Sequence, residues 1–424
     1  MKLFRYLLPL FLAQAGFGQI PDHIYRANIH SVQLFKTGDM TAYPVMRLNA
    51  GDQLELDFDD LDGDIKNYYY TYELLNADWT PTLLRPFDYI QGFQDVRIGN
   101  YRQSSIAFTR YTHYQAMVPD RNCVPTHSGN YLLKVYLNAD TSQLVFTRRF
   151  LVVDTKTSLA AQVQQPFSPD RSRTQQKLRI IVQTNSSVNN FSPQDIKVVA
   201  LQNQIWQSSI FLDRPTINRG NYFEYNDENQ TSFPAGKEWR WIDLRSLRLL
   251  SDRMAHMDQG RNRTDVFVKP DAERSNQVYV FYRDLNGGFT IESYENLNPM
   301  WQGDYAYVHF TFFPPGNQPY AGRELYLFGA MTDFELNDST RMKFNDTRGA
   351  YEGTLLLKQG FYNYAYVTVA ANRQPGQPFS LENTEGNYQS TENMYTILVY
   401  YRPFGARADE LIGYTTISSL FQRP

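Results

Sequence analysis

Short segments in which apolar and polar residues alternate recur along the whole chain. In the stretch 53–58, for example, Leu54, Leu56 and Phe58 occupy every second position. Alternation with a period of two places apolar side chains on one face of a β-strand. Polar turns separate these segments, and no long stretch repeats its apolar residues with the period of an amphipathic helix. The chain is therefore predicted to be all-β.

The length and composition set the expected number of domains. At about 100–150 residues per domain, a chain of 424 residues corresponds to two to four domains. Its 42% hydrophobic and 15% aromatic residues can fill several cores. Polar stretches at 154–158 and 164–174 mark one boundary, and a new block of strands begins near Gly303. About seven short strands per block predict immunoglobulin-like β-sandwiches. We expect three tandem sandwiches, over 19–155, 156–302 and 303–424.

The first residues have the pattern of a cleavable signal peptide. A basic start and an apolar run over 7–15 precede the Gly-Phe-Gly of 16–18, which puts small residues at both recognition positions of a cut before Gln19. The apolar run is about ten residues long, whereas a membrane-spanning helix needs about 20. No later stretch approaches eighteen consecutive apolar residues. We expect residues 1–18 to be removed and the mature protein to be exported without a membrane span.

The cysteine content and the net charge restrict how the chain can be stabilised and which partners it can bind. Cys123 is the only cysteine, so the chain can form no internal disulfide and must be stabilised by its cores. The formal net charge is −3, and it becomes −5 when the two basic residues of the signal peptide are removed. Nucleic-acid-binding proteins carry basic surfaces that neutralise phosphates. Nucleic acid is therefore not an expected partner.

The sequence contains no motif for catalysis. Gly-x-Ser-x-Gly and glycine-rich phosphate-binding loops are absent, and the six histidines do not pair at zinc-ligand spacings. Paired glycosidase carboxylates can come from any two strands, so a sequence search does not test for them. The prediction is a protein that is not an enzyme, with no catalytic residue, metal or cofactor.

The acidic stretch 57–64 is the first place to look for a metal ion. An EF-hand loop requires oxygen ligands at its first, third and fifth positions and glycine at its sixth. Aligning the loop on Gly63 puts Phe58 at the first position, so the register fails. A looser calcium site built from several loops and a solvated acidic turn both remain open.

Three strings near the N-terminus carry a family resemblance. They are 58–64 (Phe-Asp-Asp-Leu-Asp-Gly-Asp), 67–70 (Asn-Tyr-Tyr-Tyr) and 76–79 (Asn-Ala-Asp-Trp). These strings resemble the first-domain signature of the type IX secretion system plug protein of Bacteroidetes. The stretches 391–403 and 411–414 are similar to the end of the same family.

The resemblance implies a non-enzymatic periplasmic protein that seals the periplasmic end of a large outer-membrane translocon barrel when no cargo is engaged. The barrel protein would be its partner at the inner face of the outer membrane, and the plug would be a monomer within that hetero-complex. Aromatic side chains can anchor such an interface, although packing inside the first sandwich is the competing role. The candidate partner-contacting residues are Tyr68, Tyr69, Tyr70, Trp79, Asp59, Asp60 and Asp62.

The last block has a second resemblance, to the early-set sandwiches of glycogen-recognising domains. It is carried by 325–334, 349–353 and 360–366. Phe334 stands where those domains usually have Trp, and the paired sugar-stacking Trp residues are missing, so only the fold is carried over. An exported glycan-binding surface module is the alternative function, and an exported cargo enzyme is a third. Cargo of this route usually ends in a dedicated sorting domain, which the stretch 395–424 does not match.

Overall fold

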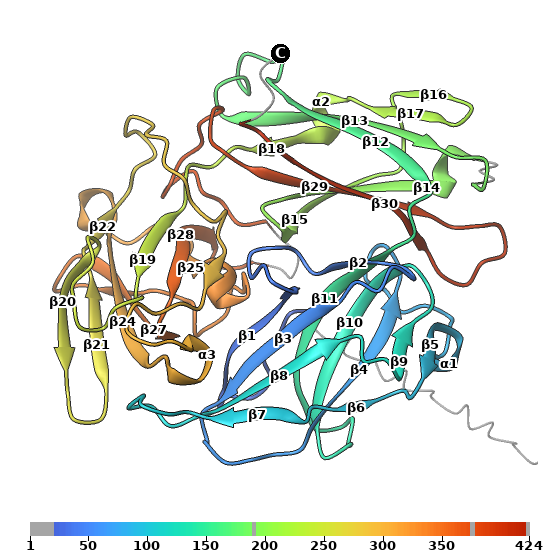
Figure 1. Ribbon diagram of the computed structural model, residues 1–424. Helices are drawn as coiled ribbons and strands as arrows, with labels where there is room; N and C mark the ends of the chain where they lie inside the picture. The colour runs from blue at the N-terminus through green and yellow to red at the C-terminus, as the bar shows by residue number, and fades with distance from the viewer. Residues whose placement is uncertain (1–20, 189–191, 374–377, 421–424) are drawn as a thin grey trace, which may run out of the picture.

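The computed structural model describes residues 21–188, 192–373 and 378–420 (Figure 1). The predicted signal peptide, 1–18, and its cleavage before Gln19 lie outside these residues. Strands dominate the described chain, and its α-helices are single turns: α1 (Pro86–Tyr89), α2 (Glu228–Thr231) and α3 (Pro299–Gln302). In these ranges no helix has the length and apolarity needed to cross a bilayer. The predicted all-β class is confirmed.

The first domain is a sandwich of two sheets. One sheet has the order β1 (Ile29–Lys36), β3 (Leu54–Asp60), β8 (Thr112–Val118) and β7 (Asn100–Gln103). The other has the order β2 (Val45–Arg47), β11 (Leu144–Val153), β10 (Gly129–Leu137), β4 (Tyr68–Leu75) and β6 (Val96–Arg97). A separate ribbon pairs β5 (Ile90–Gly92) with β9 (Cys123–Pro125). Alternation explains the core, because Tyr68, Tyr70 and Tyr72 of β4 are buried while the residues between them are not.

The second domain is a second sandwich. Its first sheet has the order β12 (Thr157–Gln164), β13 (Gln175–Thr184), β17 (Tyr222–Tyr225) and β16 (Ile217–Arg219), with β18 (Ser232–Pro234) also on β13. Its second sheet has the order β15 (Ile205–Leu212), β14 (Ile196–Gln202), β29 (Met394–Tyr401) and β30 (Glu410–Ser418). Leu178, Val198 and Val399 are among the residues of the core between the sheets.

The third domain packs two more sheets. One consists of β19 (Arg240–Asp243), β28 (Phe361–Ala370) and β23 (Phe289–Thr290), with β25 (Arg323–Phe328) also on β28. The other has the order β20 (Met254–Gln259), β21 (Thr264–Val268), β24 (Tyr305–Phe313), β27 (Ala350–Lys358) and β26 (Lys343–Asn345), with β22 (Asp271–Ala272) on β24. Ile242, Phe310 and Tyr364 lie in the core of this domain.

The strand pairings differ from the predicted boundary at 302/303. Strands β19 to β23 precede that boundary but belong to the sheets of the third domain, while β29 and β30 follow it and complete a sheet of the second. The third domain is therefore inserted into the second, and Figure 1 shows the red C-terminal strands lying among green ones. A serial division assumes that neighbours in sequence pair in space, which fails for about one third of successive strands.

Gly413 of β30 gives a test of how the C-terminal strands pack in the second domain. A Cβ at Gly413 would lie 2.3 Å from Thr157 Oγ1 of β12, in the facing sheet. We expect Gly413→Ala to lower the free energy of unfolding by about 1–3 kcal/mol, the usual cost of overpacking. Thr157→Ala in the same chain should restore part of the loss, as measured by urea denaturation. Gly99→Ala is the control, because a Cβ there meets open space. Equal stabilities of Gly413→Ala and Gly99→Ala would contradict the packing of β30 on β12.

Candidate functional site

The first sheet of the first domain turns its outer face to the third domain. Leu54, Leu56 and Phe58 of β3 point into the first-domain core, so Asp57 and Asp59 point the other way. Both carboxylates are nevertheless buried, because the third domain covers them. Two charged residues that would face water in an isolated domain therefore lie inside the protein.

Asp59 is held by groups from both domains. Its Oδ2 accepts hydrogen bonds from Lys358 Nζ at 2.5 Å and from Tyr305 Oη at 2.6 Å, both in the third domain. Its Oδ1 lies 2.8 Å from Nδ1 of His113, on the neighbouring strand β8. The Lys358 ammonium also donates to the carbonyl of Met300 and lies 4.3 Å above the ring of Tyr111. The side chains of Asp59 and Lys358 are each 1% exposed, so this is a fully buried ion pair.

The electrostatics of the pair follow from its partners. Burial disfavours the Asp59 carboxylate, but the Lys358 ammonium and the His113 hydrogen bond outweigh it and hold the pKa of Asp59 below its ordinary value. Burial also opposes a charged imidazole, yet the neighbouring carboxylates of Asp57 and Asp59 raise the pKa of His113. Burial lowers the pKa of Lys358, although Asp59 acts against the shift. The His113 ring thus lies between two carboxylates of one strand, and its Nε2 is 3.3 Å from Asp57 Oδ1.

The string 76–79 lies at the junction of the first and second domains. The Ala77 amide donates to Asp409 Oδ2 at 3.0 Å, and Asn76 Oδ1 accepts from Arg402 Nη2 at 2.6 Å. Arg402 also donates from Nε to Asp409 Oδ1 at 2.8 Å. Trp79 packs edge-on against Trp206 of β15, with ring centroids 4.9 Å apart. The contacts join this turn to the C-terminal strands of the second domain.

The acidic turn contains its own counter-ion. Lys66 Nζ lies 2.8 Å from Asp60 Oδ2 and 3.2 Å from Asp64 Oδ1, and it also pairs with Asp62. Burial lowers the pKa of Lys66, but the hydrogen bonds to these aspartates outweigh it and raise the pKa above its ordinary value. The three carboxylates that could hold a metal ion therefore share one ammonium, which offsets part of their charge.

The structure places the predicted partner-contacting residues in two groups. Tyr68, Tyr70, Asp59 and Asp60 are buried, so a partner cannot reach these four while the domains keep this arrangement. Tyr69, Trp79 and Asp62 keep some exposure, and their role in partner binding stays a prediction. Sequence reasoning missed Lys358, Arg402 and Asp409, whose importance depends on contacts far along the chain. The one local signal was Lys358 itself, a lone charge directly after the apolar run of β27.

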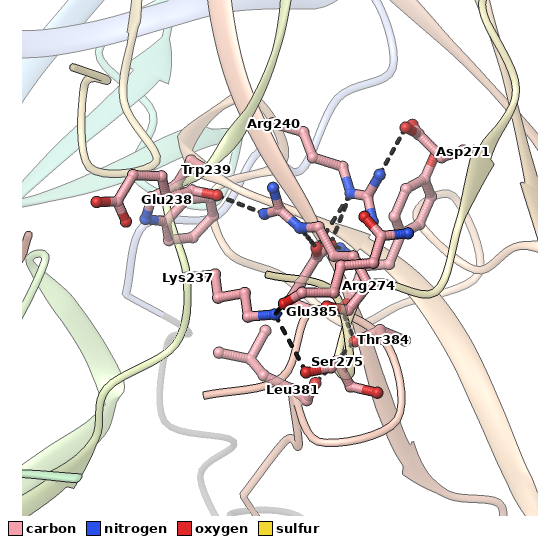
Figure 2. A network of polar contacts seen from close by, with 12 residues as sticks. Lys237, Glu238, Trp239, Arg240, Asp271, Arg274, Ser275, Leu381, Thr384 and Glu385 are labelled. Carbon is pink, nitrogen blue, oxygen red and sulfur yellow. Dashed lines mark hydrogen bonds and ion pairs between the residues drawn. The ribbon is translucent and has the colours of Figure 1, made fainter. Parts of the chain in front are cut away.

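A second buried network holds the third domain together (Figure 2). Arg240 donates to Glu385 Oε1 at 3.0 Å and to Asp271 Oδ1 at 2.6 Å, and Arg274 donates to Glu385 Oε2 at 2.5 Å. Burial disfavours the Glu385 carboxylate, but the two guanidinium groups outweigh it and lower the pKa of Glu385 to about 2. Glu238 lies beside this network with little compensating charge, and burial raises its pKa to about 7.

Phe334 of the glycogen-domain-like segment is a packing residue. Its ring contacts the rings of Phe328 and Trp239, with centroids 5.3 Å and 6.4 Å apart. Trp239 is itself buried. These rings pack against one another, so the segment gives no support to the alternative glycan-binding function.

Comparisons with known proteins bear on the first domain and on the whole chain. Residues 29–154 match the family model described as the type 9 secretion system plug protein first domain. The first domain belongs to this plug family. The two strings that join the plug first domain to its neighbours, 58–64 and 76–79, lie within the matched residues. No curated protein matched the chain.

Solved structures extend the comparison beyond the plug first domain. A crystal structure of a hypothetical protein from Parabacteroides merdae ATCC 43184 has a TM-score of 0.89 and 29% sequence identity, covering 94% of this chain and 100% of that chain. This chain therefore shares its three-domain arrangement with that structure. Trypsin-activated alpha-2-macroglobulin from Escherichia coli has a TM-score of 0.17 at 12% identity, covering 92% of this chain and 28% of that one.

The buried ion pair predicts a large cost for removing one partner. Lys358→Met leaves the Asp59 carboxylate buried without its ammonium, so we expect the free energy of unfolding to fall by about 3–5 kcal/mol. In a double-mutant cycle with Asp59→Asn, the two losses should be far from additive, because the residues share one interaction. Urea denaturation is the measurement. Lys343→Met, at an exposed lysine, is the control and should change stability by less than about 0.5 kcal/mol. A loss at Lys358 no larger than at Lys343 would contradict the assignment.

The raised pKa of the Glu238 carboxyl predicts that the stability of the fold depends on pH. Its folded pKa, about 7, lies above the unfolded value, so its contribution to stability is present at low pH and lost as the pH rises through about 7. His113, whose pKa is also raised, acts in the same direction. We expect the midpoint temperature of thermal unfolding to decrease as the pH is raised from 5 to 8. The decrease should be smaller for Glu238→Gln. The exposed Glu382→Gln should keep the native pH profile. A Glu238→Gln profile parallel to the native one would refute the attribution.

Proposed function

We propose that this protein is a non-enzymatic periplasmic plug, which seals the periplasmic end of the outer-membrane translocon barrel of the type 9 secretion system. Removal of the predicted signal peptide, 1–18, would release it into the periplasm. The first-domain family supports a place in this secretion system. The observation that carries the proposal is the locking of three domains into one body. A seal must keep its shape under load, and Asp59, Lys358 and Asp409 make buried cross-domain contacts that serve this need.

An apolar surface suits the partner contact. Leu83, Phe87 and Phe93 lie in or next to α1 and β5, and their exposed fractions are 78%, 72% and 68%. This end of the first domain points away from the third domain (Figure 1). Large exposed apolar side chains close together in a chain are typical of protein interfaces. We take this α1/β5 surface as the contact with the barrel.

The experiment is a permeability assay in a strain that lacks this protein. A pore wide enough for folded cargo admits large antibiotics unless it is filled, so the deletion strain should become sensitive to vancomycin. The native chain should restore resistance and should co-purify with the barrel protein. A specific interface buries about 1,000 Å² or more and depends on central apolar anchors. The combined Leu83→Ser, Phe87→Ser and Phe93→Ser variant should therefore neither restore resistance nor co-purify with the barrel protein.

The matched control carries three serines at exposed leucines of the third domain, Leu249, Leu250 and Leu297. It should restore resistance like the native chain. Folding of both variants is checked by thermal unfolding. If the deletion strain is no more permeable than its parent while the barrel is present, and the tagged native chain captures no barrel protein, the sealing function is refuted. Restoration by the α1/β5 variant would refute that surface alone.

A further inference from the structure

The three domains enclose a cleft of about 1020 Å³. Strand β1 of the first domain lines it with Val32, Gln33 and Leu34, and β23 of the third domain contributes Phe289. Strand β15 of the second domain contributes Trp206, Gln207, Ser209 and Phe211. Each of these strands lies at the edge of its own sheet. Three sheet edges from three domains thus meet at one opening.

Strand β15 is the edge best placed to accept another strand. It pairs with β14 on one side, and no strand pairs with its other side in the described chain. Gln207, Ser209 and Phe211 project into the cleft, whereas Ile210 and Leu212 pack into the second-domain core. The Phe211 side chain remains 48% exposed. An unpaired edge with an exposed aromatic ring is the surface to which extended peptides bind by strand addition.

Carboxylates outnumber basic side chains in the lining of the cleft. Three guanidinium groups line it, and Arg148 and Arg149 already pair with Asp333 and Asp22. The carboxylates that line it are Asp22, Asp78, Asp284, Asp333, Glu335 and Glu392. Burial raises the pKa of Asp284 and of Asp333 to about 6, because the positive charge nearby does not compensate fully. An occupant that carries cations would supply the missing charge.

We propose that this cleft binds an extended, lysine- or arginine-containing peptide segment of a partner protein, which adds as a strand to β15. The eight residues of β15 extend about 26 Å at ~3.3 Å per residue. Backbone hydrogen bonds to the β15 edge would hold the segment. Alternate apolar side chains would lie against Phe211, and alternate cations would lie toward Glu392 and Asp284. This recognition site goes beyond the sealing role and concerns a different surface from the α1/β5 surface.

The test uses the purified full chain and a synthetic probe. The probe is a fluorescein-labelled twelve-residue peptide in which lysine alternates with valine and tyrosine, followed by fluorescence anisotropy. We expect saturable binding that weakens with salt. A second probe carries glutamate in place of lysine, and a third is N-methylated at alternate amides so that one edge cannot donate hydrogen bonds. Both should bind at least tenfold more weakly. Hydrogen exchange should show protection of 205–212 when the lysine probe is bound.

Two variants locate the site. Phe211→Ala and Glu392→Gln should each weaken binding of the lysine probe at least fivefold. Phe404→Ala is the control, because Phe404 is 94% exposed and lies outside the cleft. No saturable binding of the lysine probe by the native chain, or equal binding of the glutamate or N-methylated probe, would overturn the proposal. So would unchanged binding by both variants. None of these results depends on a translocon, so they are independent of the permeability assay.

Discussion

The buried ion pair between Asp59 and Lys358 fixes how the first and third domains fit together. Burying an unpaired charge costs several kcal/mol, so any sliding that kept the domains in contact but separated these groups would be strongly disfavoured. Apolar contacts alone tolerate such sliding, because they have no preferred direction. The hydrogen bonds from Tyr305 and His113 complete the coordination of the carboxylate. The pair therefore contributes orientation more than net stability.

The insertion of the third domain into the second also determines how the domains are arranged. The third domain is joined to the second at both of its ends, because β18 precedes it and β29 follows it. The first domain contacts the third through Asp59 and the second through the 76–79 turn. Each domain thus touches both others. Three convex bodies in mutual contact cannot fill the space at their centre, which gives a geometric reason for the cleft.

The pKa values of the carboxyls in this protein are shifted in opposite directions by their surroundings. The Asp59 and Glu385 carboxyls face enough positive charge that their pKa values are lowered despite burial. Asp333 also pairs with Arg148, but Asp22 and Glu335 lie nearby and burial prevails, so its pKa is raised. The carboxyls of Asp59 and Glu385 thus have enough positive charge beside them within this chain, whereas the carboxyl of Asp333 does not.

The sequence by itself determined the all-β class, the core-facing set of side chains in strands such as β3 and β4, and the strings that carry the plug-family likeness, because period-two alternation and local composition are readable without contacts. It did not determine that β29 pairs with β14, or that Asp59 and Tyr70 are inaccessible to a partner. The alternation puts Asp57 and Asp59 on the outer face of β3, and it cannot say whether water or another domain covers that face. Only the tertiary structure decided this, since Lys358 lies 299 residues from Asp59 and a contact at that separation leaves no local pattern.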